Sequence, residues 1–451
     1  MTKKTRLKII SMGLAATVVA AMSLMAACAP APPEEEVAPP KEEVAPPKEE
    51  VELEPFKIGA TYSFSGPYAA TSAENFKGAV LAFEEIEAMG GVNGHPLVHV
   101  YADDSSDLDK AVANFKKVIA GDAVALMGGY FVCLPLVELA DKYKLPYQTQ
   151  SACGPYNVAE TPSKYDMCTW ALAGPNYPPV WENDAWGEYK GDHLRMIREL
   201  KLPVKKVAIT YNRVGILETM GLGAADYYNR LPDEYEVVML EPVDVGKKDW
   251  TAEILKLKEL QPDAVIAQCV AGDSSLLVRQ MRELDYNPPL FYGGFSAPTP
   301  DFTKGVGVEN LEGIIGIMYI IKGTPPADTY IKKFEARWGY EPEYHSAYCY
   351  ENVWELYFAI KALLDEGKPV TGENIWQALH DLELPLSPEY GRVLSPLEYL
   401  EGEMMGVNKW ACIKNFQFRK NGEKELVYSP LAEHKDLLKP FVYPMPTWAE
   451  K

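Results

Sequence analysis

Short apolar runs alternate with segments of helical periodicity from Lys57 to Tyr292, and this alternation constrains the fold more than any other feature of the sequence. In its first unit, the strand Ile58–Tyr62 is followed by the turn Ser63–Pro67, a long helix that ends at Gly90–Gly91, and a strand that ends at Asp103–Asp104. Two strands joined by a helix form a right-handed parallel unit, and ligands bind at the edge where such strands end. We therefore expect functional residues at the carboxyl edge of the sheet.

The same alternation continues beyond the first unit. The further predicted strands are Ala123–Met127, Leu145–Thr149, Val204–Tyr211, Tyr235–Leu240, Ala264–Gln268 and Leu290–Tyr292. The helices predicted between them are Leu108–Ala120, Leu134–Tyr143, Asp192–Leu200, Gly221–Arg230, Trp250–Leu260 and Leu276–Leu284. Alternation on this scale predicts the α/β class, with doubly wound parallel sheets covered by helices on both faces.

One open sheet would need more strands than is common, so we predict two lobes joined by a hinge, with a central ligand cleft. The alternation breaks at Thr169–Asp192 and at Lys322–Pro326, and a hairpin is expected around Asn421–Gly422. The predicted lobes are discontinuous in sequence: lobe 1 comprises 57–172 plus about 324–400, and lobe 2 about 173–321 plus about 401–430. Residues 431–451 form a C-terminal extension.

The first 55 residues are predicted to lie outside the folded domain. Residues 1–28 begin with basic residues and continue with an apolar run, which predicts a signal peptide; a transmembrane span is the alternative. Leu24–Cys28 resembles a bacterial lipoprotein signal, in which the cysteine is lipidated. Residues 29–55 are rich in Pro and Glu, so we expect an extended, disordered tether.

Charge and cysteine spacing exclude several classes of function. A formal net charge of −20 argues against a nucleic-acid partner, because phosphate binding needs clustered cations. Six cysteines follow Cys28, and none forms a C-x-x-C pair, which argues against structural zinc and thioredoxin-type chemistry. Outside the cytoplasm a Cys153–Cys168 disulfide is the pair to test first, and buried thiols are the alternative.

A series of motifs in the same order resembles the branched-chain amino-acid (Leu/Ile/Val) binding proteins, which are type I periplasmic solute-binding proteins of ABC transporters. The motifs are Ser65-Gly66-Pro67, Gly90-Gly91-Val92-Asn93-Gly94, Asp103-Asp104-Ser105, Met127-Gly128-Gly129, Leu145-Pro146 and Gln261-Pro262-Asp263. The resemblance covers Lys57 to about Gly422. It implies two lobes that close around a small ligand without a reaction or a cofactor.

The resemblance also indicates which residues would contact a ligand. In the family, hydroxyls and amides of the first lobe hold the carboxylate, and aromatic and acidic groups of the second lobe complete the site. The positions of this chain that we select are Ser65, Gly66, Tyr130, Ser151, Cys153, Asp273 and Phe295. Ser151 and Cys153 would hold an anionic group, and Phe295 stands where the family has an acid. Asp273 is the nearest acidic substitute, and the aromatic residues near strand ends suit an aromatic or apolar acid.

Motifs for enzymatic chemistry are weak. The six histidines are scattered, and no metal-ligand spacing or phosphate-binding loop is present, so we expect no metal and no cofactor. Gly294–Pro298 begins like a nucleophile elbow but has proline where the second glycine should be, so a hydrolase acting through Ser296 is a remote option. The acids Asp103–Asp104 are interpreted as a cap for the following helix, and Ser72 as a cap for the first one.

These observations predict an extracytoplasmic, lipid-anchored protein that binds a small organic ligand by hinge closure. The ligand would be an amino acid, an aromatic or apolar carboxylic acid, or an amide. Its partners would be the permease and ATPase of an ABC transporter, with the membrane reached only through the lipid anchor. The alternative is a sensory module that uses the same cleft to signal to a partner protein.

Overall fold

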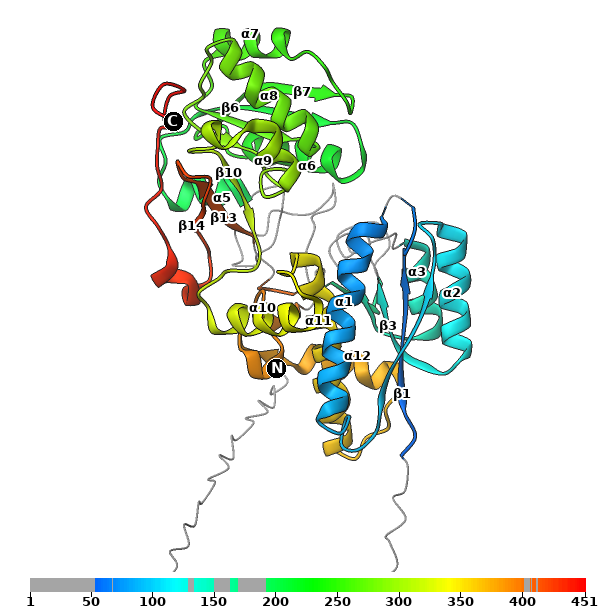
Figure 1. Cartoon of the computed structure of the whole chain (residues 1–451). Coiled ribbons are helices and arrows are strands. Elements are labelled where there is room, and N and C mark those ends of the chain that lie inside the picture. Colours follow the sequence, from blue (N-terminus) through cyan, green and yellow to red (C-terminus); the bar gives the residue numbers. More distant parts are fainter. Residues whose placement is uncertain are drawn as a thin grey trace, which may run out of the picture. The chain divides into compact units, whose positions relative to one another are not determined.

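The computed structural model describes residues 53–66, 68–128, 134–149, 163–168, 192–400, 406, 408–410 and 413–451. These residues form two main β-sheets, each packed with its own helices, which we call lobe 1 and lobe 2 (Figure 1). The α/β class with parallel sheets, which the alternation predicted, is confirmed. Within the described ranges, every helix is too short or too polar to cross a lipid bilayer.

Lobe 1 is built on a five-stranded, all-parallel sheet in the order β2-β1-β3-β4-β5. Its strands are β1 (Phe56–Tyr62), β2 (Leu97–Asp103), β3 (Ala123–Gly128), β4 (Tyr147–Thr149) and β5 (Asp166–Cys168). Its helices are α1 (Ala69–Ala88), α2 (Leu108–Ala120), α3 (Leu134–Tyr143), α11 (Tyr344–Asp365) and α12 (Gly372–Asp381). Helices α1 and α11 pack with Ile58 and Ala60 on one face, and α2 and α3 pack with Leu126 on the other.

Lobe 2 is built on a seven-stranded sheet in the order β14-β13-β10-β9-β8-β6-β7. Its strands are β6 (Lys206–Asn212), β7 (Glu236–Val243), β8 (Ala264–Gln268), β9 (Phe291–Tyr292), β10 (Ile315–Met318), β13 (Lys414–Phe418) and β14 (Lys424–Tyr428). Its helices are α5 (Asp192–Glu199), α6 (Gly215–Asn229), α7 (Thr251–Leu260), α8 (Ala271–Glu283), α9 (Pro300–Val306) and the short η2 (Val308–Asn310). The predicted hairpin around Asn421–Gly422 is present as the antiparallel pair β13–β14.

The two faces of the lobe 2 sheet are covered by different helices, and the period-2 pleat decides which side chain faces which. Ala264 and Ile266 of β8 cluster with residues of α5 and α6, whereas Val265 and Ala267 cluster with residues of α7, α8 and α9. Gln268, the last residue of β8, therefore shares the face of Ala264 and Ile266, which is the face of α5 and α6.

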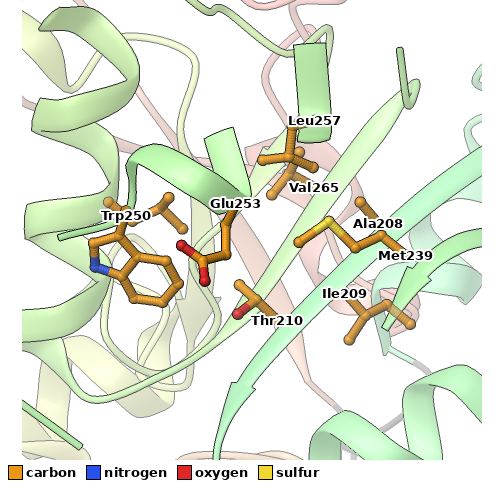
Figure 2. Close-up of a pocket in the computed structure, with 9 residues that line it drawn as sticks. Ala208, Ile209, Thr210, Met239, Trp250, Glu253, Leu257 and Val265 are labelled. Carbon is orange, nitrogen blue, oxygen red and sulfur yellow. The ribbon is translucent and has the colours of Figure 1, made fainter. Parts of the chain in front are cut away.

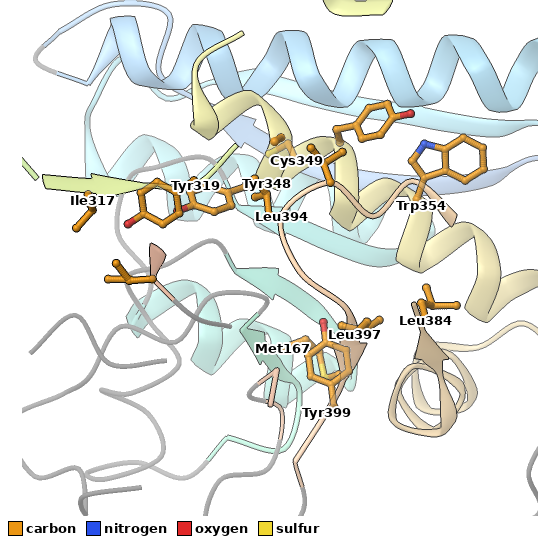
Figure 3. Packing of buried hydrophobic residues seen from close by; sticks show 14 of the residues in the cluster. Met167, Ile317, Tyr319, Tyr348, Cys349, Trp354, Leu384, Leu394, Leu397 and Tyr399 are labelled. Atoms are coloured by element: carbon orange, nitrogen blue, oxygen red, sulfur yellow. The ribbon is translucent and has the colours of Figure 1, made fainter. Parts of the chain in front are cut away.

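A buried charged network fixes the chain that follows α12 against α11. This chain contains β11 (Glu383–Leu384), η3 (Pro388–Tyr390) and β12 (Leu397–Glu398). The Arg392 side chain is fully buried with Glu351 and Glu355 of α11, and its Nη2 lies 3.0 Å from Glu351 Oε2. Glu355 also accepts from Gln148 of β4 and from the Tyr399 hydroxyl. Figure 3 shows the apolar residues around this network, including Leu397 and Tyr399 near Met167 of β5.

Two further segments lie outside the sheets. Helix α10 (Pro325–Trp338) packs on α1, and Lys333 forms an ion pair with Glu85 at 3.0 Å. The predicted C-terminal extension contains η5 (Ala432–Leu437) and continues along lobe 2. In this extension Met445 is buried in the α7–α9 core, and the Trp448 indole donates to the Tyr286 carbonyl at 2.9 Å.

Two predicted helix caps are wrong. Helix α1 begins at Ala69, so Ser72 lies inside it, and the Ser72 hydroxyl accepts a hydrogen bond from the Ser63 amide at 2.8 Å. Helix α2 is capped by Asp107, which accepts from the Lys110 amide at 2.9 Å, and not by Asp103 or Asp104. In both cases the side chain bonds to a neighbouring loop, which short-range helix signals do not reveal.

Candidate functional site: the carboxyl edges of the two sheets

The turn after β1 contains Ser65 and Gly66, two of the predicted ligand contacts, and both are exposed. Gly66 adopts a φ of +84°, and a Cβ on it would lie only 2.7 Å from the Ser106 Oγ. The Ser106 hydroxyl donates to the Ser65 carbonyl at 2.8 Å, so the turn is fixed to the loop that follows β2. Glycine is required here because the backbone is left-handed and closely approached.

The buried Asp104 side chain connects the loops at the same edge of the sheet through hydrogen bonds. Its carboxylate is only 1% exposed and accepts from the Thr61 hydroxyl at 2.9 Å, the Ser63 hydroxyl at 2.5 Å and the Ser106 amide at 2.9 Å. Three donors to one buried carboxylate satisfy it without a cation. The side chain that was interpreted as a helix cap therefore holds the loops after β1 and β2 together.

Aromatic side chains gather beside this turn. The Phe76 ring lies 5.1 Å from that of Phe64 and 4.8 Å from that of Tyr101, and Tyr62 packs against all three. Phe64 is 41% exposed and Tyr101 46% exposed. Lobe 1 thus presents apolar ring surface next to the polar Ser65–Gly66 turn.

In lobe 2, the structure places Asp273 in the first turn of α8, where it is buried. Its carboxylate accepts from the Asn212 side chain at 2.9 Å and from the Gly246 amide at 3.0 and 3.1 Å. Asp273 therefore ties the loops after β6 and β7 to α8. Phe295, the other predicted contact in lobe 2, is half-buried and follows Gly294 directly after β9.

The remaining predicted contacts, Tyr130, Ser151 and Cys153, lie outside the described residues, as does Cys28. The Cys153–Cys168 disulfide stays a prediction for the same reason. Of the other cysteines, Cys269 and Cys349 are buried thiols.

Ser296 lacks the surroundings of a nucleophile. It is 4% exposed, and its hydroxyl donates to the Cys269 carbonyl at 2.6 Å and lies 3.1 Å from the Ser274 hydroxyl. A catalytic serine needs a base as its partner. The hydrogen bonds of Ser296 therefore join the loop after β9 to α8.

The sequence analysis missed Gln268, whose side chain is 1% exposed at the carboxyl end of β8. Neither its Oε1 nor its Nε2 has a hydrogen-bond partner in the described part of the chain. A buried amide without partners costs about 1–3 kcal/mol, so such groups are rare. The sequence signal that could have revealed it is a polar residue directly after the apolar run Ala264–Ala267, at the end of a predicted strand.

His193 of α5 is buried on the same face of lobe 2. One ring nitrogen, Nδ1, lies 2.9 Å from the Tyr228 hydroxyl, and the ring is 5.1 Å from that of Tyr292. Burial lowers the pKa of His193 to about 3, so the imidazole is neutral at physiological pH. Its Nε2 has no partner among the described residues.

A small cavity between α7 and strands β6–β8 is too small for an organic solute. Its volume is about 10 Å³, which is room for one water molecule, whereas ligand pockets measure several hundred Å³. Figure 2 shows the Glu253 carboxylate beside the Trp250 ring, with Thr210 below it. This cavity is therefore no candidate for the ligand site that the sequence predicts.

Two sheets whose central strands run parallel, each with polar and aromatic side chains where these strands end, define the class of two-lobed α/β binding proteins. The family model described as "Periplasmic binding protein" matches residues 55–393, which is more than half of the chain. The chain belongs to this family, whose members are extracytoplasmic solute-binding proteins associated with ABC transporters.

Individual comparisons agree with this assignment. The chain is 25% identical to Leu/Ile/Val-binding protein homolog 1 of Brucella abortus over 323 residues, covering 68% of this chain and 78% of the relative. A solved structure described as a branched-chain amino acid ABC transporter protein from Silicibacter pomeroyi has a TM-score of 0.72 at 19% identity, covering 87% of this chain and all of that one. A solute-binding protein from R. palustris in complex with benzoate has a TM-score of 0.60 at 17% identity, covering 83% and 95%.

Proposed function

We propose that this protein is the solute-binding component of a branched-chain-amino-acid-type ABC transporter, which captures a small organic ligand by hinge closure and delivers it to the permease and ATPase. The observation that carries the proposal is the family match, which spans the described strands of lobe 1 and all five parallel strands of lobe 2. Hinge closure then brings polar groups of both lobes to one ligand.

The ligand in this proposal is an amino acid, an aromatic or apolar carboxylic acid, or an amide. The exposed ring surface of Phe64 and Tyr101 supports an apolar portion of the ligand. The neighbouring protein from R. palustris, which is in complex with benzoate, indicates that the fold accommodates an aromatic acid. The proposed contacts are Ser65, Gly66, Tyr130, Ser151, Cys153 and Phe295, and we assign Asp273 a positioning role because both of its oxygens are bonded within lobe 2.

Lipid attachment at Cys28 and a disordered tether over residues 29–55 complete the proposal. The protein would then remain at the outer face of a membrane while the folded domain reaches the permease. Replacing Cys28 with Ala should release the protein from the membrane fraction into the soluble extracytoplasmic fraction. Retention of the Cys28→Ala variant in the membrane would contradict lipidation at this residue.

A thermal-shift screen followed by calorimetry tests the binding function. The screen compares leucine, valine, aromatic acids, amides and dicarboxylates. A ligand at 100 times its dissociation constant stabilises the native state by about 2.7 kcal/mol. We expect at least one member to bind with 1:1 stoichiometry and to be recovered chemically unchanged. Failure of every class to stabilise the protein, or turnover of a bound compound, would contradict the proposal.

A further inference from the structure

The Gln268 carboxamide stands in a row of residues that crosses the carboxyl end of the lobe 2 sheet. Strand register aligns Gln268 with Tyr211 of β6, and Ile317 of β10 with Asn415 of β13. Gly294 lies between them, because the Ile317 amide donates to the Gly294 carbonyl at 3.3 Å. No residue of this row carries a charge. We call this uncharged row the neutral shelf. It lies at the carboxyl edge of the parallel strands, where proteins with parallel sheets bind their ligands.

Another glutamine in the same sheet shows what a paired amide looks like. Gln417 of β13 is also 1% exposed, and its Nε2 donates to the Gly313 carbonyl at 3.1 Å and the Val442 carbonyl at 2.9 Å. Its Oε1 accepts from the Val442 amide at 2.9 Å. Gln268 has the same burial and none of these bonds. Because an unpaired buried polar group destabilises the folded state, the Gln268 amide needs an explanation.

The absence of a side chain at Gly294 makes room for the Gln268 amide. A Cβ on residue 294 would lie 2.8 Å from Gln268 Oε1 and 3.3 Å from Tyr292 Cε1. The φ of Gly294 is +49°, so a side chain here would also strain the backbone. The residue after this glycine is Phe295, one of the proposed ligand contacts. The amide is thus next to the loop that the proposed function places at the ligand.

We propose that the Gln268 carboxamide recognises a neutral group of the ligand that presents a donor and an acceptor side by side, such as a primary carboxamide. A carboxamide in this position pairs with both Oε1 and Nε2. A carboxylate would satisfy only Nε2 and would face the Oε1 lone pairs, whereas an ammonium group would satisfy only Oε1. This inference rests on the proposed function and narrows its ligand to the amide class.

Neutral surroundings support the choice of a neutral group. His193, whose Nε2 has no partner among the described residues, is held uncharged by burial, and Asp273 is engaged with Asn212 and Gly246. An ionised ligand group placed against the shelf would lose its hydration without gaining a counter-ion from the row, which costs several kcal/mol.

Matched ligand trios test the proposal on the purified protein. Each trio keeps one carbon skeleton and changes the polar group: phenylacetamide, phenylacetate and phenethylamine, and isovaleramide, isovalerate and isoamylamine. We expect the amide of at least one trio to bind at least tenfold tighter than its acid and amine in calorimetry. Tighter binding of the acid or amine would overturn the inference but leave solute binding intact. Absence of binding by both trios and by the whole screen above would contradict the proposed function itself.

A pair of variants tests the inference without any ligand. Gln268→Met keeps the volume and removes the unpaired amide, so the ligand-free variant should be at least as stable to urea as the wild type. Gln417→Met, the matched control, removes four hydrogen bonds, because the Gln417 Oε1 also accepts from the Arg419 guanidinium at 3.1 Å, and this variant should be less stable. A loss of stability in Gln268→Met equal to that in Gln417→Met would show that the Gln268 amide is already paired, for example by a buried water, and would overturn the proposal. Gln268→Met should also abolish the preference for the amide in the trios.

Discussion

The carboxyl edges of the two sheets differ in the hydrogen bonding of a buried polar side chain. In lobe 1 the Asp104 carboxylate accepts hydrogen bonds from Thr61, Ser63 and Ser106, and these bonds fix the loops of that edge. In lobe 2 the Gln268 amide is equally buried, and neither of its polar atoms has a partner in the described chain. A paired group stabilises the fold, whereas an unpaired one costs stability unless something else binds to it. We infer from this comparison that the lobe 1 edge is rigid before a ligand binds. In lobe 2, the Gln268 amide is the polar group that would form its hydrogen bonds with the ligand.

The largest expected effect comes from the buried charges of lobe 1. Arg392→Met would leave the Glu351 and Glu355 carboxylates buried without their cation, which should lower the free energy of unfolding by about 3–5 kcal/mol. Urea unfolding measures this. In the control Arg337→Met, the lost partner Glu84 is exposed, so the cost should stay below about 1 kcal/mol. Equal losses in the two variants would show that the buried ion pairs stabilise the fold no more than an exposed one.

Removing the centre of the lobe 1 edge should have the next largest effect. Asp104→Ala leaves two hydroxyls and one amide without their acceptor and should cost about 2–4 kcal/mol. Asp103→Ala is the matched control, because the Asp103 side chain is exposed and its partners among the described residues are Phe64 and Ser105. We expect about 1 kcal/mol or less for Asp103→Ala. The comparison between the edges fails if Asp104→Ala is as mild as this control.

Glu351 should make the stability of lobe 1 fall as the pH rises. Burial raises the pKa of Glu351 to about 7, although Arg392 opposes this shift. The folded state therefore holds a proton that the unfolded state releases near pH 4.5, so the stabilisation is complete below that pH and is lost as the pH rises through 7. The loss is on the order of 3 kcal/mol, because each pKa unit corresponds to about 1.4 kcal/mol. Unfolding of Glu351→Gln, measured across this range, should lack this component, and an identical pH profile would contradict the assignment.

His193 gives lobe 2 the opposite sign. Its pKa is lowered to about 3 by burial, so the unfolded state takes up a proton below pH 6.5 while the folded state does not. The stabilisation is present above pH 6.5 and is lost as the pH falls towards 3, with about 2 kcal/mol gone by pH 5. NMR of the imidazole carbons should show no titration of His193 between pH 7 and 5. A midpoint near 6.5 would show that the His193 ring is solvated in the folded state and would contradict this prediction.

Much of the fold could be predicted from the sequence, because strands such as Ala264–Gln268 and helices such as Leu108–Ala120 are encoded by local periodicity. The site was harder to predict. Ser65 and Gly66 were recognisable from a turn motif, but the partners of Asp104 and Asp273 come from loops that are distant in sequence. Whether a buried polar group is paired depends on those partners and not on its own neighbours in the chain.

The sequence by itself determined the alternation of elements and the two-lobed class, because both follow from short-range patterns of apolar residues and turns. Only the tertiary structure decided that the carboxylates of Asp104 and Asp273 accept several hydrogen bonds, whereas the Gln268 amide has no partner among the described residues. Hydrogen bonding of a buried group is a property of three-dimensional proximity. The sequence patterns therefore identified the carboxyl edge of the lobe 1 sheet. They did not identify the Gln268 amide of lobe 2, on which the inferred choice of ligand depends.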